Sequence, residues 1–342
     1  MFWIHAGPHK TASSYIQDIL QVNRQHLQQR GVFVAKKSDA KTFARHFNNG
    51  EIDAIQQLKF IRKKENKCKL LSSEWLHPTI LNSGSISKLE LLSNKINSKI
   101  GLIFFIRDQA SWINSMYCHT IRRLYHRRDF AEFAKSWCVQ KNYWTLDWCT
   151  KFENLNTSGI DHKYIVMSSI KSSDPVEDLM QAIGFNYPQN EWQTKTINSV
   201  NIQPGTRGIW LSKICKEICD SLDVNTEELK NRGQEIRDIA IKKRWHLEKF
   251  YGFNQDLYNE ITTNFDDGNK TFAEKYLNNE WQHFFPHKKV IESVYHSPKD
   301  EHELIELQKS LLEALERMNF PKSKIKEASS LFQDYAIRQQ PI

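Results

Sequence analysis

The sequence predicts an α/β fold with a central, mainly parallel sheet flanked by helices and a helical C-terminal part. Three observations support this class. In roughly the first half of the chain, short apolar runs alternate with segments of helical periodicity. Residues 100–106 are almost entirely apolar, as expected for a parallel strand that is buried on both faces. From about Gly205 onward, helical patterns predominate.

Five short segments fit strands, because they are rich in apolar and β-branched residues and too short for helices. They comprise residues 2–6, 31–35, 68–73, 100–106 and 164–167. Helical spacing predicts one helix over residues 13–29 and another over residues 175–183, closed by Gly184. The alternation favours a doubly wound sheet with right-handed crossovers, in which ligands bind at the carboxyl ends of the strands.

The C-terminal region has one apolar helical stripe, formed by Leu304, Leu307, Leu311, Leu315 and Met318. We expect this stripe to pack against the chain's own core, and a contact in a homodimer is the alternative. We therefore predict two parts, an α/β domain over residues 1–285 and a helical extension over residues 286–342 packed on it.

The composition indicates a folded, basic protein of 342 residues. Lys and Arg outnumber Asp and Glu by 48 to 40, which suggests anionic partners such as nucleotides, acidic glycans or nucleic acid. An ordinary basic surface is the alternative. The six cysteines lack metal-ligand or redox spacing, which favours free thiols. Without a leader-like segment or a run of 18 apolar residues, the chain is expected to be cytoplasmic with no membrane span.

The junction between the first strand and the first helix has the composition of a phosphate or sulfate cradle. Gly7 suits a tight turn, and Lys10, Thr11, Ser13 and Ser14 follow at the start of a helix, whose free amides favour an anion. The lysine stands too early for the phosphate-binding loop of nucleotide kinases. Ordinary helix capping with a solvated lysine is the alternative.

A second candidate site follows the fourth strand, where Arg107 is followed eight residues later by Ser115. A guanidinium gives forked, charge-assisted hydrogen bonds to a phosphate, and a serine two helical turns along can donate another. The alternatives are a strand-end salt bridge of Arg107, for example with Asp108, and an exposed helix serine.

A proton acceptor is expected near these sites, and Glu74 stands at the end of the third strand. A non-catalytic glutamate at a helix N-terminus is the alternative. Among the histidines, His9 is expected to contact a ligand, His5 to be a core residue, and His77 to contact a substrate or support Glu74.

A basic run further along the chain contains Arg122, Arg123, Arg127 and Arg128. Arg122 and Arg123 are candidates for binding an anionic substrate, and a solvated basic helix face is equally compatible with the pattern. Arg207 lies in a Gly-rich segment, where it is either a nucleotide contact or a surface residue.

The segment from His9 to Tyr15 resembles the phosphosulfate-binding loop of the sulfotransferases that use 3′-phosphoadenosine 5′-phosphosulfate (PAPS). The resemblance implies that His9 belongs to the donor site and that Lys10 holds the bridging oxygen of the donor. It also implies that the backbone amides and hydroxyls of Thr11, Ala12, Ser13 and Ser14 bind the phosphate. Ala12 replaces the glycine usual in that family, and we expect an ordinary backbone angle there.

The spacing of Arg107 and Ser115 resembles the 3′-phosphate site of the same family, and the segment ending in Glu74 resembles that of glycan-modifying members, in which a glutamate is the base. The resemblance implies a three-layer P-loop-like fold. It also implies in-line transfer of a sulfuryl group from PAPS to an acceptor hydroxyl, which leaves 3′-phosphoadenosine 5′-phosphate (PAP). The expected acceptor is a hydroxyl-bearing glycan, either neutral or anionic.

We expect no required metal, because no ligand cluster of recognisable spacing is present. A nucleotide phosphotransferase with a P-loop is one alternative function. A basic nucleic-acid-binding protein without catalysis is another, but the basic run contains a single aromatic residue, Tyr125, so we expect no nucleic-acid partner.

Overall fold

The computed structural model describes residues 1–62, 68–140, 145–168, 174–186, 192–193, 202–229 and 232–338. The chain forms two compact units, each built from three separate stretches. The first comprises Met1–Trp112, Cys138–Asn198 and Thr262–Lys288, and the second comprises Ile113–Trp137, Ser199–Ile261 and Lys289–Ile342. The expected division into residues 1–285 and 286–342 stays a prediction, because compact units need not coincide with independently folding domains.

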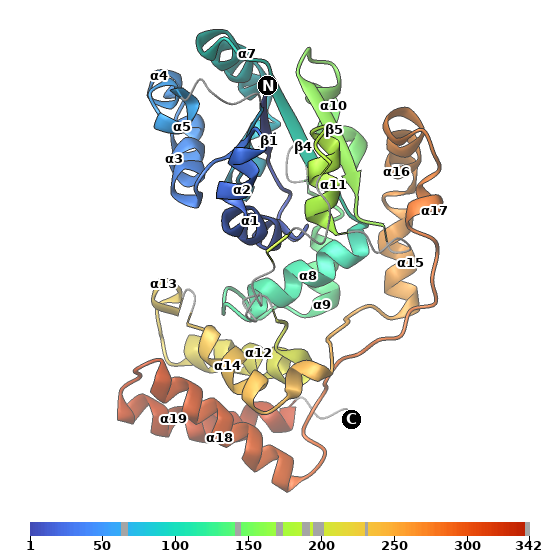
Figure 1. The fold of residues 1–342 in the computed structure, drawn as a ribbon. Helices are drawn as coiled ribbons and strands as arrows, with labels where there is room; N and C mark the ends of the chain where they lie inside the picture. Colours follow the sequence, from blue (N-terminus) through green and yellow to red (C-terminus); the bar gives the residue numbers. More distant parts are fainter. Residues whose placement is uncertain are drawn as a thin grey trace. The chain divides into compact units, whose positions relative to one another are not determined.

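The first unit contains a five-stranded parallel sheet, which confirms the predicted α/β class (Figure 1). The strands are β1 (Phe2–His5), β2 (Val32–Val34), β3 (Cys68–Ser72), β4 (Ile100–Ile106) and β5 (Asp161–Val166). Their order in the sheet is β2-β3-β1-β4-β5. Strand β1 therefore lies in the centre, with His5 paired to Ser72 on one side and to Ile103 on the other.

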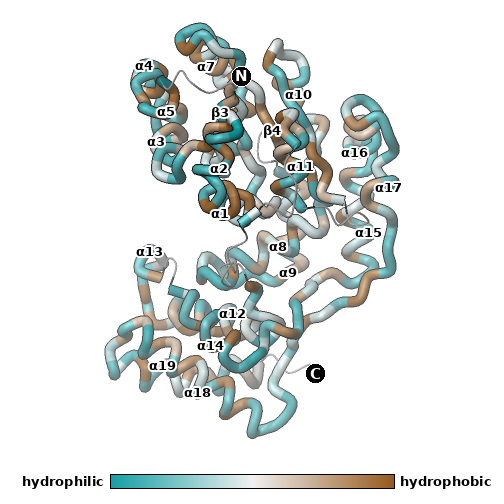
Figure 2. The backbone as a smooth tube through the Cα atoms, viewed as in Figure 1, coloured by the Kyte–Doolittle hydropathy of each residue, from teal (hydrophilic) through white to brown (hydrophobic). Residues whose placement is uncertain are grey.

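Alternate side chains of the strands enter two separate cores, one on each face of the sheet. Trp3, Ile103 and Phe105 pack on one face against α1 (Ser13–Val22), α2 (Arg24–Gln29) and α11 (Pro175–Ala182). Phe2 and Phe104 pack on the other face. Strand β4 is buried along its whole length, and most of it is brown in Figure 2.

The described residues of the first unit form ten further helices. They are α3 (Lys37–Asn48), α4 (Ile52–Gln56), α5 (Lys59–Arg62), η1 (Glu74–Leu76), α6 (His77–Ile80), α7 (Ser83–Ile96), α10 (Trp148–Asn156), α16 (Asp266–Phe272), η5 (Ala273–Leu277) and α17 (Trp281–Phe284). Each contributes a buried side chain to the core that contains Phe2 and Phe104, or continues an element that does. Helix α8 (Gln109–Ile121) begins in the first unit and ends in the second.

Two sequence predictions about element bounds were wrong. The helix predicted over residues 13–29 is divided at Asn23, where the backbone N–H and the side-chain amide both donate to the carbonyl of Ile19. Strand β5 begins at Asp161 instead of Tyr164. It is an edge strand, so its first residues alternate between exposed and half-buried and lack the apolar signal of β4.

The strand order creates a switch point at β1. The chain leaves β1 toward β2 and β3 on one side, and then crosses to β4 and β5 on the other. In open parallel sheets, ligands bind beyond the carboxyl ends of strands where the connections diverge. The segments that follow β1, β3 and β4 therefore define the edge at which a site is expected.

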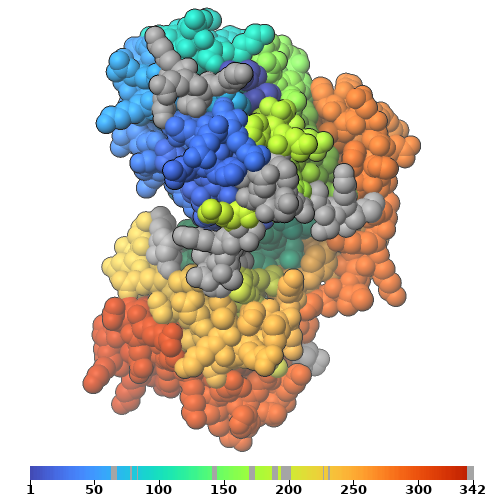
Figure 3. All heavy atoms as spheres, viewed as in Figure 1, coloured from blue at the N-terminus to red at the C-terminus, as the bar shows by residue number. Residues whose placement is uncertain are grey.

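The second unit is helical and has its own apolar core. Besides part of α8, it contains α9 (Phe130–Ser136), α12 (Gly205–Ser221), α13 (Thr226–Leu229), α14 (Gln234–Lys242), η4 (Trp245–Leu247), α15 (Gln255–Thr263, which ends just inside the first unit), α18 (Glu301–Arg317) and α19 (Lys322–Arg338). The helices α18 and α19, red in Figure 3, lie against α12 and α14.

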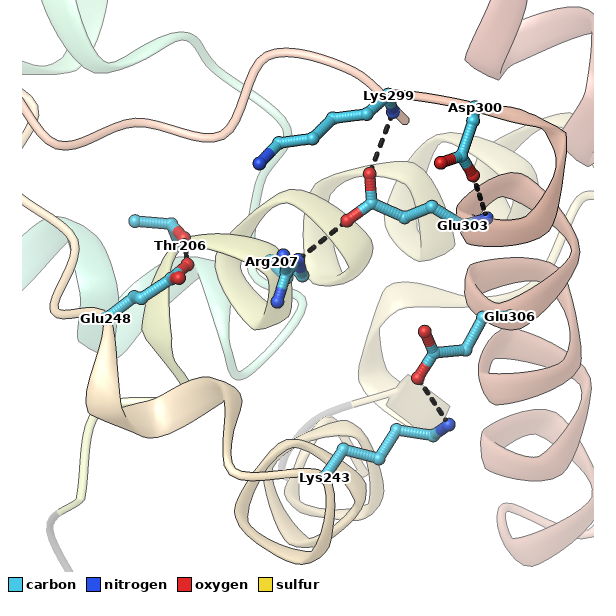
Figure 4. Close-up of polar contacts among 8 residues, drawn as sticks. All are labelled: Thr206, Arg207, Lys243, Glu248, Lys299, Asp300, Glu303 and Glu306. Atoms are coloured by element: carbon cyan, nitrogen blue, oxygen red, sulfur yellow. Dashed lines mark hydrogen bonds and ion pairs between the residues drawn. The ribbon is translucent and has the colours of Figure 1, made fainter.

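The predicted C-terminal stripe packs as expected. Leu307, Leu311, Leu315 and Met318 are buried in the core of the second unit, and Leu304 is packed against it. Ion pairs support the same contact, because Arg207 of α12 bonds Glu303 at 2.9 Å and Lys243 bonds Glu306 at 2.8 Å (Figure 4). The side-chain oxygen of Asp300 caps α18 by accepting from the amide of Glu303. Arg207 thus has a structural partner within its own unit.

Within the described part of the chain, no helix combines the length and apolar character needed to cross a membrane. All six cysteines lie in that part, and none is in a disulfide.

Candidate functional site

In the loop after β1, side-chain hydroxyl groups form hydrogen bonds with a backbone carbonyl of the same loop. Thr11 Oγ1 donates to the carbonyl of Pro8 at 2.5 Å, and Ser13 Oγ lies 3.5 Å from the same oxygen. Gly7 has a φ of 92°, and a Cβ there would lie 3.2 Å from the Cβ of His77. The side chains of Thr11 and Ser13 are therefore buried inside the turn, whereas Ser14 is half-buried.

The backbone conformation of this loop alternates between left-handed and other residues, which the sequence did not predict. Lys10 has a φ of 67° and Ala12 a φ of 59° with a ψ of 14°, so both are left-handed. The expected ordinary angle at Ala12 was wrong, because the turn into α1 demands a left-handed residue at the position where a glycine is usual. Residues that alternate in handedness turn successive amides toward one point and form concave anion sites.

Two side chains hold this loop in place, one directly after β4 and one on α8. Arg107 donates from Nη1 to the carbonyl of Lys10 at 2.8 Å, and the indole Nε1 of Trp112 donates to the carbonyl of His9 at 2.7 Å. Asp108 caps α8 by accepting from the amide of Ser111 at 2.8 Å. Trp112 was not identified from the sequence, where it resembled an ordinary apolar helix residue.

Glu74 and His9 lie together at the carboxyl edge of the sheet. The Nδ1 atom of His9 is 3.4 Å from Oε2 of Glu74, and the two side chains are 33% and 28% exposed. The hydrogen bond from His9 holds the pKa of Glu74 below its usual value against the opposing effect of burial. The charge of His9 when it is protonated, and the charge of Lys10, lower the pKa of Glu74 further.

The two other candidate histidines are buried. His5 bonds Ser72 Oγ through Nδ1 at 2.8 Å, and burial lowers its pKa to about 4 although the charge of Glu74 opposes this. Burial also lowers the pKa of His77 well below its usual value, aided by the charge of Lys151. Both imidazoles are therefore neutral near pH 7. His5 is a core residue as expected, although its Nε2 has no hydrogen-bond partner among the described residues.

A buried lysine near His77 was missed in the sequence. Lys151 is 6% exposed, donates from Nζ to the carbonyl of Thr145 at 2.9 Å and lies 5.4 Å from the ring centroid of Trp148. Burial lowers its pKa to about 7. In the sequence, its only signal is its place between two aromatic residues of α10, which does not distinguish it from a surface lysine.

The remaining predicted site residues belong to the second unit. Ser115 is half-buried on the later part of α8. Arg122 donates to the carbonyl of Ile202 at 3.4 Å, and its burial, together with the charges of Arg237 and Arg123, lowers its pKa to about 10. Arg123 donates to the hydroxyl of Tyr125 at 3.2 Å.

The rest of the basic run also has partners inside the second unit. Arg127 lies 3.8 Å from a carboxylate oxygen of Asp220, and Arg128 lies 5.2 Å from the ring centroid of Phe133. Of the predicted site residues, the first unit thus brings together residues 9–14, Glu74, His77 and Arg107. Ser115, Arg122 and Arg123 are not part of it.

Comparisons with protein-family models, curated proteins and solved structures found no match to this chain. The described residues contain no group of three or more His, Cys, Asp or Glu side chains placed to hold a metal ion. The interpretation of the site therefore rests on its own geometry and chemistry.

Proposed function

We propose that this chain is a sulfotransferase with a P-loop-like fold, which transfers a sulfuryl group from PAPS to an acceptor hydroxyl. The observation that carries the proposal is the loop at residues 9–14. It combines two left-handed residues, a lysine and a helix start at the carboxyl end of the central strand. These features suit an anionic group that is bound by backbone amides.

The charges around the loop support an anionic nucleotide. Lys10 stands in the loop, and the guanidinium of Arg107 is bonded to the backbone of that lysine. A planar guanidinium at this point is the kind of group that gives forked, charge-assisted hydrogen bonds to a phosphate. Glu74 lies beside His9, which directly precedes Lys10 in the chain. Both side chains of this pair are able to accept a proton.

The proposed mechanism is an in-line displacement at sulfur. PAPS supplies an activated sulfuryl group, and the protein supplies position and charge. Lys10 and the amides at the start of α1 stabilise the negative charge that grows on the leaving phosphate. The pair formed by Glu74 and His9 receives the proton of the acceptor hydroxyl, without a required metal ion.

For the acceptor, we propose a hydroxyl of an oligosaccharide or polysaccharide, bound on the Glu74 side of the loop next to His77. The predicted roles of Arg122 and Arg123 in binding an anionic acceptor, and of Ser115 in binding the 3′-phosphate, stay predictions, because these residues belong to the second unit. The same proposal includes a cytoplasmic location, and a homodimer as a candidate oligomeric state. Each of these points depends on the donor being PAPS.

The test is calorimetric binding of PAP, AMP and ATP without magnesium, for the wild type and for Arg107→Ala and Arg107→Lys. We expect selective binding of PAP. The alanine variant should lose charge-assisted hydrogen bonds of about 1.5–3 kcal/mol, which is roughly 10- to 150-fold in Kd. The lysine variant should recover only part of the lost affinity, because an ammonium group lacks the forked donor geometry of a guanidinium. Arg45→Ala, at an exposed position of α3, is the matched control.

Magnesium-dependent binding of ATP in preference to PAP would identify a phosphotransferase instead. Binding of DNA or RNA with a steep salt dependence, and none of PAP, would favour the nucleic-acid-binding alternative. If PAP binds, transfer of radiolabelled sulfate from PAPS to a panel of glycans identifies the acceptor, and Glu74→Gln is the inactive control.

A further inference from the structure

In the pair formed by His9 and Glu74, one particular ring nitrogen faces the carboxylate, which suggests different tasks for the two residues. His9 presents Nδ1 to the carboxylate of Glu74 at 3.4 Å. A neutral imidazole carries its proton on one ring nitrogen and a lone pair on the other. If Nδ1 donates to Glu74, the lone pair is on Nε2, at the opposite side of the ring.

We propose that His9, and not Glu74, takes the proton from the acceptor hydroxyl, and that Glu74 is a positioning residue that orients His9. This inference rests on the proposed sulfotransferase function, and it assigns separate roles to the two residues of the proposed base. The same division occurs in nucleophilic triads, in which a carboxylate fixes the tautomer and orientation of a histidine base. The length of 3.4 Å fits a site without substrate, because such hydrogen bonds tighten on binding.

The position of His9 supports this role. Its backbone carbonyl is fixed by the indole of Trp112 at 2.7 Å, and it directly precedes Lys10. The base and the group that stabilises the leaving phosphate are then neighbours in the chain. Glu74 suits the role of a permanent anion, because its hydrogen bond with His9 and the nearby charges keep its pKa low and make it a weak base.

The proposed step balances in protons and electrons. The acceptor oxygen forms a bond to sulfur while its proton moves to Nε2 of His9. The bond between sulfur and the bridging oxygen breaks, and its electron pair remains on the phosphate of PAP, beside Lys10. The imidazolium formed at His9 is stabilised by the carboxylate of Glu74.

The first test needs no substrate. Nitrogen-15 NMR of the histidine rings, above the pH at which imidazole is protonated, reports the tautomer, and His9→Gln assigns the His9 signals. We expect His9 to carry its proton on Nδ1 in the wild type and to shift toward the Nε2-protonated form in Glu74→Ala. A wild-type His9 that is protonated on Nε2 would overturn the proposal.

The second test measures turnover of PAPS to PAP and sulfate, with water as the acceptor. His9→Ala should lose activity by about 10²-fold or more, and added imidazole should restore a measurable part of it. Glu74→Ala should not respond to imidazole, because its own imidazole is still present. Rescue of neither variant, or unchanged turnover in His9→Ala, would refute the assignment.

Binding of PAP separates the two levels of inference. If the wild type fails to bind PAP, the proposed function fails, whatever the tautomer of His9. If the wild type and His9→Ala bind PAP equally but imidazole has no effect, the sulfotransferase proposal stands and the role of His9 as base is refuted.

Discussion

Ala12→Gly should stabilise the protein, because Ala12 has a backbone conformation that glycine adopts more easily than alanine. With a φ of 59°, Ala12 has a left-handed conformation, which costs an L-residue about 1–2 kcal/mol and glycine almost nothing. Glycine also increases the entropy of the unfolded chain, which costs about 0.4–1 kcal/mol. The difference predicts a net stabilisation of about 0.5–1 kcal/mol. For a unit of about 200 residues this corresponds to a rise of about 1–3 °C in melting temperature.

Calorimetry or thermal melting of the full chain measures this shift for the first unit. The matched control is Ala54→Gly, at a half-buried position of α4 with no positive φ, where we expect a loss of about 0.5–1 kcal/mol. Ala12→Val should be strongly destabilising, since a β-branched residue is disfavoured at positive φ. If Ala12→Gly and Ala54→Gly lowered the melting temperature equally, the reasoning about the loop would be refuted.

Three further predictions concern other buried features. The pKa of Lys151 is about 7 in the folded protein and about 10 in an unfolded chain, so wild-type stability should rise from pH 7 to pH 10. Urea midpoints should show that Lys151→Met abolishes this rise. Glu303→Gln, which weakens a partly buried ion pair, should cost the second unit about 1.5 kcal/mol in thermal unfolding, whereas Glu313→Gln in an exposed pair should cost under about 0.5 kcal/mol. Gly205→Ala should lower the melting temperature sharply, because its Cβ would lie 1.9 Å from a backbone oxygen, whereas Gly84→Ala meets open space and should be neutral or stabilising.

The elements of the sheet were largely predictable from the sequence. The apolar run of β4 needed no further information, because a strand covered on both faces has no polar side. The edge strand β5 was predicted too short, since Asp161 and Lys163 are exposed and its other side chains are only half-buried. At the division, Asn23 makes a side-chain hydrogen bond that periodicity does not reveal.

The candidate site was predictable in its members but less so in its arrangement. The sequence placed His9 and Glu74 after two different strands, and their meeting requires β1 and β3 to be neighbours. The left-handed angle of Ala12 was not predicted, because alanine alone gives no sign of it. Lys151 was missed, since its burial follows from packing around α10.

The interleaved path of the chain has a consequence for folding during synthesis. The core of the second unit joins Trp210 and Ile214 of α12 to Leu311 of α18 and Phe332 of α19. About a hundred residues separate these partners, so the apolar face of α12 leaves the ribosome well before the helices that cover it. Until α18 and α19 have been made, the part of this apolar face that they cover can bind chaperones or aggregate. Slowing translation before α18 should therefore lower the yield of folded protein, while the strands of the sheet, all within the first half of the chain, have already been made.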